Sequence, residues 1–287
     1  MPLLSVCLRS HNQEAFIGHA VESVLMQHTA FQFEIIICDD CSSDNSLTIL
    51  SKFKEQDGRI RLLMNQTNEG GPRTLQKVIE SSDSKYLAFL DGDDYYTDTY
   101  KLQKQVEFLE AHPEYAACFH NVINVYEDSS QRPSLFLPLD FPAFHDCVSI
   151  ISEDWFLPIH SVVLRREYIF FPKWYEKVMN DDYVVNLSVA MHGPYHYMPD
   201  VMAVYRHHKR NISNNYSNQV LIDSQLRTIL VGFKDIYPAQ YNSVFDKRII
   251  YYDGRIAFNK REQRQPWRKY FRLKTYKKLI KRLLGVL

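Results

Sequence analysis

Three carboxylates lie within four residues in the segment Asp91-Gly92-Asp93-Asp94, directly after the apolar run at residues 86–90. Carboxylates this close together repel one another unless a cation joins them. Mg²⁺ and Mn²⁺ prefer oxygen ligands and often bind through one or two carboxylates together with substrate phosphates. We therefore expect a divalent metal at Asp91, Asp93 and Asp94, where it would neutralise a diphosphate leaving group. A solvated acidic turn, or an aspartate that caps the next helix, is the alternative interpretation.

The strands and helices that would position these carboxylates alternate over the first hundred residues. Short apolar runs predict buried strands at residues 3–8, 33–38, 60–64 and 86–90. Between them, apolar residues at helical spacing predict helices at residues 14–27, 47–53 and 72–81. This alternation predicts an α/β fold with a doubly wound, mostly parallel sheet that has helices on both faces.

Polar clusters follow three of these strands at their carboxyl ends. Residues 10–12 (Ser-His-Asn) come after the first strand, Asp39-Asp40 after the second, and Asp91 with its acidic neighbours after the fourth. In open parallel sheets the ligand lies beyond the carboxyl ends of the strands. We therefore expect the three clusters to form one site.

The rest of the chain carries weaker signals. It predicts further strands at residues 116–125, 161–164 and 201–205, and further helices at residues 99–111, 182–192 and 220–236. A Pro- and Ser-rich stretch at residues 129–142 is typical of a surface loop. We expect one domain at residues 1–215 and a helical, basic C-terminal extension at residues 216–287. Within the domain, a donor half at 1–125 would bind the molecule that gives up a chemical group, and an acceptor half at 126–215 would bind the molecule that receives it.

Four segments occur in the order and spacing typical of family 2 glycosyltransferases with the GT-A fold. They read SVCLRSHNQEAFIGHAVESVLMQ, FEIIICDDCSSDNSL, NEGGPRTLQK and KYLAFLDGDDYY. The chain resembles this family densely over residues 3–125 and more thinly to about residue 213. The resemblance implies a GT-A-type fold and the transfer of a sugar from a nucleotide-diphosphate donor, dependent on Mn²⁺ or Mg²⁺ and with inversion at the anomeric carbon.

The resemblance also implies roles for residues of the first two clusters. Ser10 and Asn12 would line the nucleotide pocket, although Arg9 and His11 depart from the Thr and Tyr often found there. Asp40 would accept a hydrogen bond from the base. The alternative interpretation of Asp40 is an ordinary turn residue.

A loop near the diphosphate is implied by a third segment. Asn68, Gly70 and Arg73 resemble this loop in the family, while Gln76 stands where Asn is common. All three would bind the nucleotide-sugar donor.

The acidic residues divide into a metal pair and a base. Asp91 and Asp93 match the DxD motif of the family, with Asp93 as the main metal ligand and Asp94 in support. The later pair Asp181-Asp182 resembles a Glu-Asp pair whose second member is the catalytic base. A sugar hydroxyl is a poor nucleophile until a carboxylate takes its proton, so Asp182 is the expected base. The alternative is a helix N-cap, and Asp181 could cap while Asp182 acts as the base.

The segment Tyr205-Arg206-His207-His208 resembles the Tyr-Arg-x-His motif that closes the family's site. Arg206 or His208 would contact the diphosphate, since a cation suits a leaving phosphate. A basic loop on the surface is the alternative interpretation.

Charge is distributed unevenly along the chain, although the formal net charge is +0. Residues 246–287 carry 14 Lys or Arg against three acidic residues, a formal charge of +11, and the rest carries −11. From Pro266 to Leu287, apolar and aromatic residues recur at helical spacing between basic ones, which predicts a helix that lies on an anionic membrane surface. The alternative is a terminal helix packed on the domain. Nucleic acid is not an expected partner, because no recognition motif accompanies the charge.

The cysteines and the N-terminal residues indicate a cytoplasmic protein. Five cysteines are an odd number, and the Cys38-x-x-Cys41 pair has no second pair to complete a zinc site. Cys7, Cys38 and Cys118 lie in apolar runs, and buried free thiols suit a reducing compartment. The first residues lack the features of a secretory signal, and no apolar stretch reaches the length of a membrane span. We expect a cytoplasmic enzyme, with peripheral attachment to the inner face of the cell membrane as an option.

The expected function is the transfer of a sugar, from a UDP-linked donor, to a hydroxyl of a glycan or of a lipid-linked glycan. Two other classes stay open. A metal-dependent nucleotidyltransferase would be expected to carry a Gly-rich phosphate loop near the first strand, where this chain has SHNQEAF. A non-catalytic nucleotide- or glycan-binding module would be favoured by the loss of an acidic residue at the metal or base position, and both positions are acidic.

Overall fold

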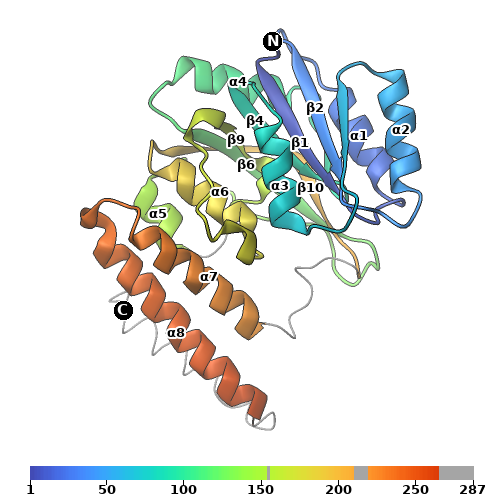
Figure 1. Ribbon diagram of the computed structural model, residues 1–287. Helices are drawn as coiled ribbons and strands as arrows, with labels where there is room; N and C mark the ends of the chain where they lie inside the picture. The colour runs from blue at the N-terminus through green and yellow to red at the C-terminus, as the bar shows by residue number, and fades with distance from the viewer. Residues whose placement is uncertain (154–155, 210–218, 265–287) are drawn as a thin grey trace.

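A mixed sheet forms the centre of the protein, with helices on both of its faces (Figure 1). The structure, a computed structural model, describes residues 1–153, 156–209 and 219–264. The strand order along the sheet is β3-β2-β1-β4-β9-β6-β10-β5, with β7 on β6 and β8 on β10. Central strands therefore come from both the N-terminal and the later part of the chain.

The first four long strands form a parallel group, as the sequence predicts. They are β1 (Leu4–Ser10), β2 (Phe33–Asp39), β3 (Ile60–Met64) and β4 (Tyr86–Asp91). In this register Ser10 pairs with Asp39, and Arg9 pairs with Asp91. The carboxyl ends of the four strands thus meet along one edge, which is where the polar clusters were expected.

The first three helices divide between the two faces of the sheet. They are α1 (Ile17–Leu25), α2 (Ser46–Gln56) and α3 (Gly71–Glu80). Side chains of a strand alternate between faces. Along β1, Val6 belongs to the core cluster that α1 and α2 cover, whereas Cys7 belongs to the cluster on the face of α3. This arrangement confirms the doubly wound α/β fold.

The rest of the sheet joins this parallel group through a short reversed strand. β9 (Val163–Arg165) is antiparallel to both β4 and β6 (Ala117–Tyr126), and β6 is parallel to β10 (Tyr195–His207). The smaller elements after β4 are β5 (Tyr95–Tyr96), α4 (Lys101–Ala111), β7 (Ser134–Leu135), β8 (Phe144–His145) and α5 (Cys147–Ser152). Single 3₁₀ turns lie at Ile159–Ser161, Arg166–Tyr168, Tyr175–Lys177 and Ala239–Tyr241.

The last core strand is longer than the predicted residues 201–205. β10 runs over 13 residues, and its register against β6 shifts between Met198 and Val201 and again before Ala203. The polar Pro-Asp pair at this irregularity interrupts the apolar alternation on which the prediction depended. The sequence pattern therefore shows only the second part of the strand.

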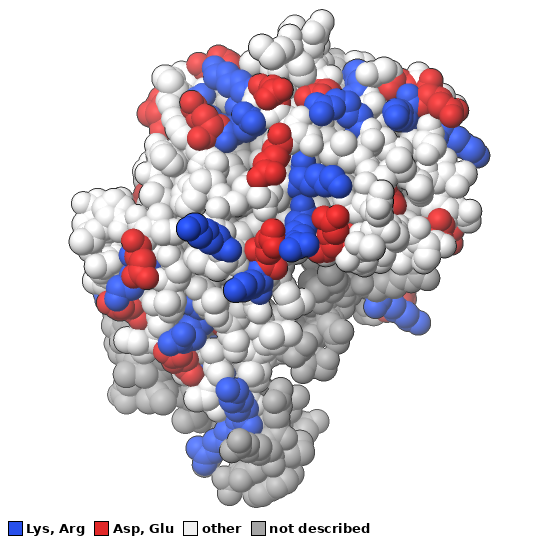
Figure 2. All heavy atoms as spheres, in the orientation of Figure 1, with Lys and Arg blue, Asp and Glu red and all other residues white. Residues whose placement is uncertain are grey.

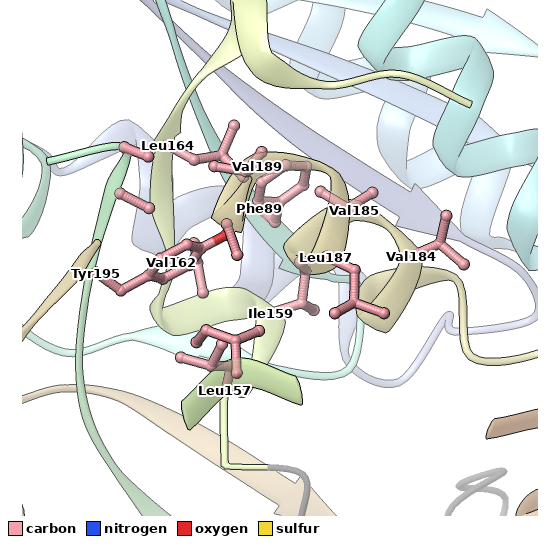
Figure 3. Packing of buried hydrophobic residues seen from close by; sticks show 14 of the residues in the cluster. Phe89, Leu157, Ile159, Val162, Leu164, Val184, Val185, Leu187, Val189 and Tyr195 are labelled. Atoms are coloured by element: carbon pink, nitrogen blue, oxygen red, sulfur yellow. The ribbon is translucent and has the colours of Figure 1, made fainter. Parts of the chain in front are cut away.

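Helix α6 (Asp181–Ala190) is buried on most of its circumference, and this burial fixes the place of the acidic pair at its start. Figure 3 shows Val184, Val185, Leu187 and Val189 packed among Phe89, Leu157, Ile159, Val162, Leu164 and Tyr195. A helix that is apolar on all sides lies inside a protein. In Figure 1, α6 lies beside α3 on the same face of the sheet.

The described part of the helical region after residue 215 shares this core. It consists of α7 (Gln219–Lys234) and α8 (Asn242–Arg264), which lie side by side in Figure 1. Phe233, Phe245 and Tyr252 belong to the same core cluster as the side chains of α6. These two helices therefore pack on the rest of the protein through a shared apolar core.

Two glycines of this fold predict stability changes of opposite sign. A Cβ on Gly232 of α7 would lie 2.5–2.7 Å from ring atoms of Trp174, whereas a Cβ on Gly18 of α1 would have its nearest neighbours at 3.9 and 4.0 Å. Alanine favours a helix over glycine by up to about 1 kcal/mol. We therefore expect Gly18→Ala to raise the free energy of unfolding by up to about 1 kcal/mol. Gly232→Ala should lower it by about 1–3 kcal/mol because the rigid indole must move.

Urea denaturation followed by circular dichroism measures both free energies. Equal effects of the two substitutions, in either direction, would contradict the packing of Trp174 against α7.

The predicted amphipathic helix at residues 266–287 lies outside the described residues. Within the described ranges, none of the helices has the length and apolar character needed to cross a membrane. On the face shown in Figure 2, acidic and basic side chains are interspersed over the described surface. The charge asymmetry of the sequence therefore comes largely from the C-terminal residues that the structure does not describe.

Candidate active site

Arg9, at the carboxyl end of β1, lies between two acidic residues that are far apart in the chain. Its Nε and Nη2 donate to Oδ1 of Asp91, at 3.0 and 2.8 Å. Its Nη1 donates to Oδ2 of Asp181, the first residue of α6. The arginine thereby joins the acidic end of β4 to the acidic start of α6. The side chains of Arg9 and Asp181 are largely buried, and that of Asp91 is half-buried.

Charge and burial oppose each other in this cluster. Burial raises the pKa of the Asp181 carboxyl, and the Asp91 carboxylate raises it further, while the Arg9 guanidinium lowers it. Burial lowers the pKa of Arg9, but the attraction of Asp181 and Asp91 outweighs it, so the net shift of the Arg9 pKa is upward. Arg9 is therefore a fixed positive charge that keeps two neighbouring carboxylates together.

The turn after β4 requires a glycine between its carboxylates. The backbone N–H of Gly92 donates to the carbonyl of Arg9 at 3.0 Å. A Cβ on Gly92 would lie 2.7 Å from Cδ1 of Ile17 and 3.1 Å from that same carbonyl oxygen. The turn therefore lies tightly against the end of β1.

Asp94 connects this turn to His160 and to the end of β10. It is 2% exposed, its Oδ1 accepts the backbone N–H of Arg206 at 2.8 Å, and its Oδ2 lies 3.1 Å from Nδ1 of His160. Burial raises the pKa of Asp94 to about 6, against the opposing influence of His160. With both oxygens bound to protein groups, Asp94 supports the turn rather than facing a ligand.

Asp93 lies against the Tyr-Arg-x-His segment at the end of β10. Nε2 of His208 is 3.0 Å from Oδ2 of Asp93, and the His208 ring stacks on Phe16 at 4.7 Å. The Arg206 guanidinium lies over the rings of Phe16 and Tyr95, at 4.9 and 4.8 Å. Arg206 and His208 are thus packed at the site, and the alternative of a basic surface loop does not describe them.

The carboxylates at this edge of the sheet suit a hard divalent ion only together with a ligand that supplies further oxygen atoms. In the described parts of the chain, no group of three or more His, Cys, Asp or Glu side chains is arranged to hold a metal by itself. Asp93 and Asp91 offer two carboxylates at one edge of the sheet, and Mg²⁺ is commonly bound by one or two carboxylates plus substrate phosphates. These residues therefore fit a metal that binds with a phosphate ligand.

Asp40 organises the loop that follows β3. Its Oδ1 accepts from Nδ2 of Asn65 at 2.7 Å and from the backbone N–H of Glu69 at 2.8 Å, and its Oδ2 accepts from the backbone N–H of Gly70 at 2.9 Å. Burial opposes ionisation of Asp40, but these hydrogen bonds outweigh it and hold the pKa below its ordinary value. The turn beside Ser42 is instead bound by Asp39, whose carboxylate accepts both the N–H and the hydroxyl of Ser42.

The remaining residues predicted for the nucleotide pocket gather around the same edge. Asn12 has a positive φ of 54° and accepts the backbone N–H of Ser43 at 2.7 Å, so it connects the end of β1 to the loop after β2. Nδ1 of His11 lies 2.8 Å from the carbonyl of Asp40, and its Nε2 lies 3.1 Å from Nδ2 of Asn68. Ser10 is buried here, and its Oγ has no partner among the described residues.

Arg73 lies apart from this group. Its guanidinium binds Glu176 at 2.7 Å on the exposed side of α3, and the side chain is 53% exposed. Its contact with a diphosphate therefore stays a prediction.

At the start of α6, neither of the two aspartates is the N-cap residue. Asn180 occupies the N-cap position and makes no capping hydrogen bond through its side chain, while Asp181 is already helical and binds Arg9. Asp181 therefore does not cap, which corrects that interpretation. Asp182 follows in the first turn and is half-buried. Carboxylates are favoured there by the positive end of the helix dipole.

Sequence reasoning missed two residues of the site. Arg9 was noted only as a departure from a common residue, although a charge at the end of an apolar strand signals a buried ion pair. His160 was not considered, and no local pattern marks it, since its partner Asp94 is distant in the chain.

The model of the family "Glycosyl transferase family 2" matches residues 5–171, which is more than half of the chain. The chain belongs to this family. An uncharacterized protein of Mycobacterium tuberculosis strain H37Rv is 35% identical over 212 residues, 73% of this chain and 60% of that protein. The E. coli UDP-Glc:alpha-D-GlcNAc-diphosphoundecaprenol beta-1,3-glucosyltransferase WfaP is 37% identical over 110 residues, 38% of this chain and 42% of that enzyme. The chain thus spans less than two thirds of each of these relatives.

Solved structures place this family 2 protein in the GT-A fold. The S. aureus TarS 1-349 structure in complex with UDP-GlcNAc has a TM-score of 0.67 at 16% identity, covering 94% of this chain and 76% of that one. Mannosyltransferase PcManGT from Pyrobaculum calidifontis, in complex with GDP-Man and Mn²⁺, has a TM-score of 0.61 at 17% identity, covering 85% and 68%. At these identities the likeness establishes the fold, which confirms the GT-A-type architecture expected from the sequence.

Proposed function

We propose that this family 2 glycosyltransferase moves a sugar from a nucleotide-diphosphate donor to a hydroxyl of a lipid-linked glycan. The observation that carries the proposal is the Arg9 bridge, because it brings Asp182 on α6 to the same edge as Asp93 and the loop held by Asp40. A transferase needs a leaving-group side and a nucleophile side at one centre. These residues supply both.

The donor side would be formed by the ends of β1, β2 and β4. The loop after β3, which Asp40 holds, would offer backbone groups and side chains to the nucleotide, and Asn12 holds the neighbouring loop after β2 to β1. Asp93, with Asp91, would hold Mn²⁺ or Mg²⁺, which when bound neutralises charge on the diphosphate. Arg206 and His208 would add positive charge beside the leaving phosphate.

The acceptor side would be formed by the start of α6. The Asp182 carboxylate would take the proton of the acceptor hydroxyl while that oxygen bonds to the anomeric carbon. The bond from the anomeric carbon to the diphosphate oxygen breaks in the same step, and the nucleoside diphosphate leaves. Attack on the side opposite the leaving group inverts the anomeric carbon.

The donor and acceptor classes rest on the relatives. TarS was solved with UDP-GlcNAc, and WfaP is named for transfer from UDP-Glc to a diphosphoundecaprenol-linked sugar. These names support a UDP-linked donor and a lipid-linked acceptor. An acceptor of this kind would bring the protein to a membrane surface, where the basic residues 266–287 would meet anionic lipid.

Ligand-induced thermal stabilisation tests the proposal. The full chain is heated with UDP, dTDP, GDP or CMP, each with and without Mn²⁺. A nucleotide at ~100-fold its Kd adds about 2.7 kcal/mol to stability, which gives a clear rise in Tm. We expect UDP with Mn²⁺ to stabilise most. If no nucleotide raises Tm under either condition, the donor site is not present and the proposal is wrong.

A further inference from the structure

Arg9 has a role that the proposed chemistry does not itself require. We propose that Arg9 is a positioning residue for transfer, because it holds the first turn of α6 against the donor edge and so fixes the distance between Asp182 and the donor. This inference rests on the proposed function of Asp182. Arg9 itself would touch neither the transferred proton nor the anomeric carbon.

The first step of the argument is the geometry of the bridge. Arg9 and Asp181 are 172 residues apart in the chain, and Arg9 and Asp91 are 82 residues apart. One guanidinium donates to both carboxylates through three of its N–H groups. Because a guanidinium is planar and rigid, both carboxylates are held in a defined relation to each other.

The second step concerns the strength of this bridge. The side chains of Arg9 and Asp181 are 18% and 7% exposed. Surface ion pairs contribute little to stability, but breaking a buried pair is strongly unfavourable because a charge is left without compensation. The buried ion pair therefore stabilises the position of the first turn of α6.

The third step asks what else fixes this turn. The apolar side chains of α6 hold the middle and end of the helix, starting at Val184 (Figure 3). At the N-terminus, the side chain of Asn180 makes no capping hydrogen bond. Helix ends fray unless their terminal groups find partners. Oδ1 of Asp181 accepts the backbone N–H of Asp182 at 2.9 Å, while its Oδ2 binds Arg9. The Asp181 carboxylate therefore connects the backbone of Asp182 to Arg9.

The consequence concerns the rate of transfer rather than donor binding. A misplacement of a reacting group by about 1 Å can reduce a rate by about 10²-fold. We therefore expect Arg9→Met to lower kcat by about 10²-fold. The KM for the donor should stay within about threefold, because the nucleotide loop held by Asp40 is intact. Arg9→Lys should recover part of kcat, since a lysine retains the charge but not the fork of donors.

The two contacts of Arg9 can be separated by experiment. Asp181→Asn preserves shape and removes only the charge that pairs α6 with Arg9, so it should reproduce most of the loss in kcat. The Mn²⁺ concentration needed for half-maximal stabilisation by UDP should be unchanged in Asp181→Asn. Because both substitutions break one bridge, the double variant Arg9→Met/Asp181→Asn should lose about as much kcat as one single variant, not the product of the two losses.

Arg59→Met is the matched control, because Arg59 also pairs with an aspartate, Asp57, before β3 at the opposite edge of the sheet. It should leave kcat unchanged, and far-UV circular dichroism should show every variant folded. An unchanged kcat in both Arg9→Met and Asp181→Asn would overturn the inference. So would loss of UDP binding in Arg9→Met, which would make Arg9 a donor ligand. Failure of the proposed function looks different, since wild type would then neither bind a nucleotide nor transfer a sugar.

Discussion

Replacement of Asp182 by asparagine is expected to abolish sugar transfer while the donor still binds. General-base catalysis contributes about 10²–10⁴-fold, and an amide cannot take the proton of the acceptor hydroxyl at neutral pH. We expect kcat to fall by at least about 10²-fold. The Tm rise produced by UDP and Mn²⁺ should remain within the experimental scatter of wild type, because Asp182 lies on the acceptor side at the start of α6.

Asp200→Asn is the control for this substitution, since Asp200 is 53% exposed in the irregular part of β10 and lies outside the site. It makes the same chemical change and should transfer at the wild-type rate. Transfer is measured as release of the nucleoside diphosphate in the presence of a lipid-linked glycan acceptor. Normal transfer by Asp182→Asn would show that another group is the base, and the proposed mechanism would then be wrong.

The second large effect is expected from Asp93→Ala. This substitution removes the carboxylate that lies against His208, and with it the main proposed metal ligand. We expect the Mn²⁺-dependent part of the stabilisation by UDP to disappear, which at ~100-fold Kd is a loss of about 2.7 kcal/mol. Transfer should fall with it, because charge on the leaving diphosphate would no longer be neutralised.

Asp235→Ala removes an exposed aspartate at the end of α7 and is the control for general charge effects. Its UDP response should match wild type with and without Mn²⁺. A comparison of Tm at several Mn²⁺ concentrations separates weakened from abolished metal binding. If Asp93→Ala keeps the full Mn²⁺-dependent shift, the metal is bound elsewhere and the assignment of Asp93 fails.

The sequence predicted the donor half of the fold closely. The third strand was predicted at residues 60–64 and lies at Ile60–Met64, and the order of the first four strands and three helices is as expected. These elements are short, apolar and separated by polar turns, so their periodicity is a local property of the chain. The first part of β10 was not predicted, because the polar residues inside this strand interrupt its local apolar periodicity.

The sequence also located the edge of the sheet at which the candidate site lies. Parallel strands that alternate with helices must bring their carboxyl ends together, so the grouping of Asp40, Asp91 and Asp93 follows from strand order alone. The family resemblance added Arg206 and His208, which the structure places beside Asp93 and the Phe16 ring. These conclusions needed residue types and spacing, but no distances.

Only the tertiary structure could decide how the site's charges are paired. Asp93 and Asp94 are neighbours with the same side chain, yet Asp94 is buried against His160 and the backbone of Arg206 while Asp93 lies against His208. Arg9 binds an aspartate 172 residues away, which no local pattern indicates. Periodicity reports which face of an element is apolar, whereas the partner of a buried charge depends on how distant elements pack. The sequence by itself therefore determined the family, the fold and the edge of the sheet at which the candidate site lies. The packing of α6 beside β1, and of the end of β10 against the turn after β4, decided which partner each carboxylate has.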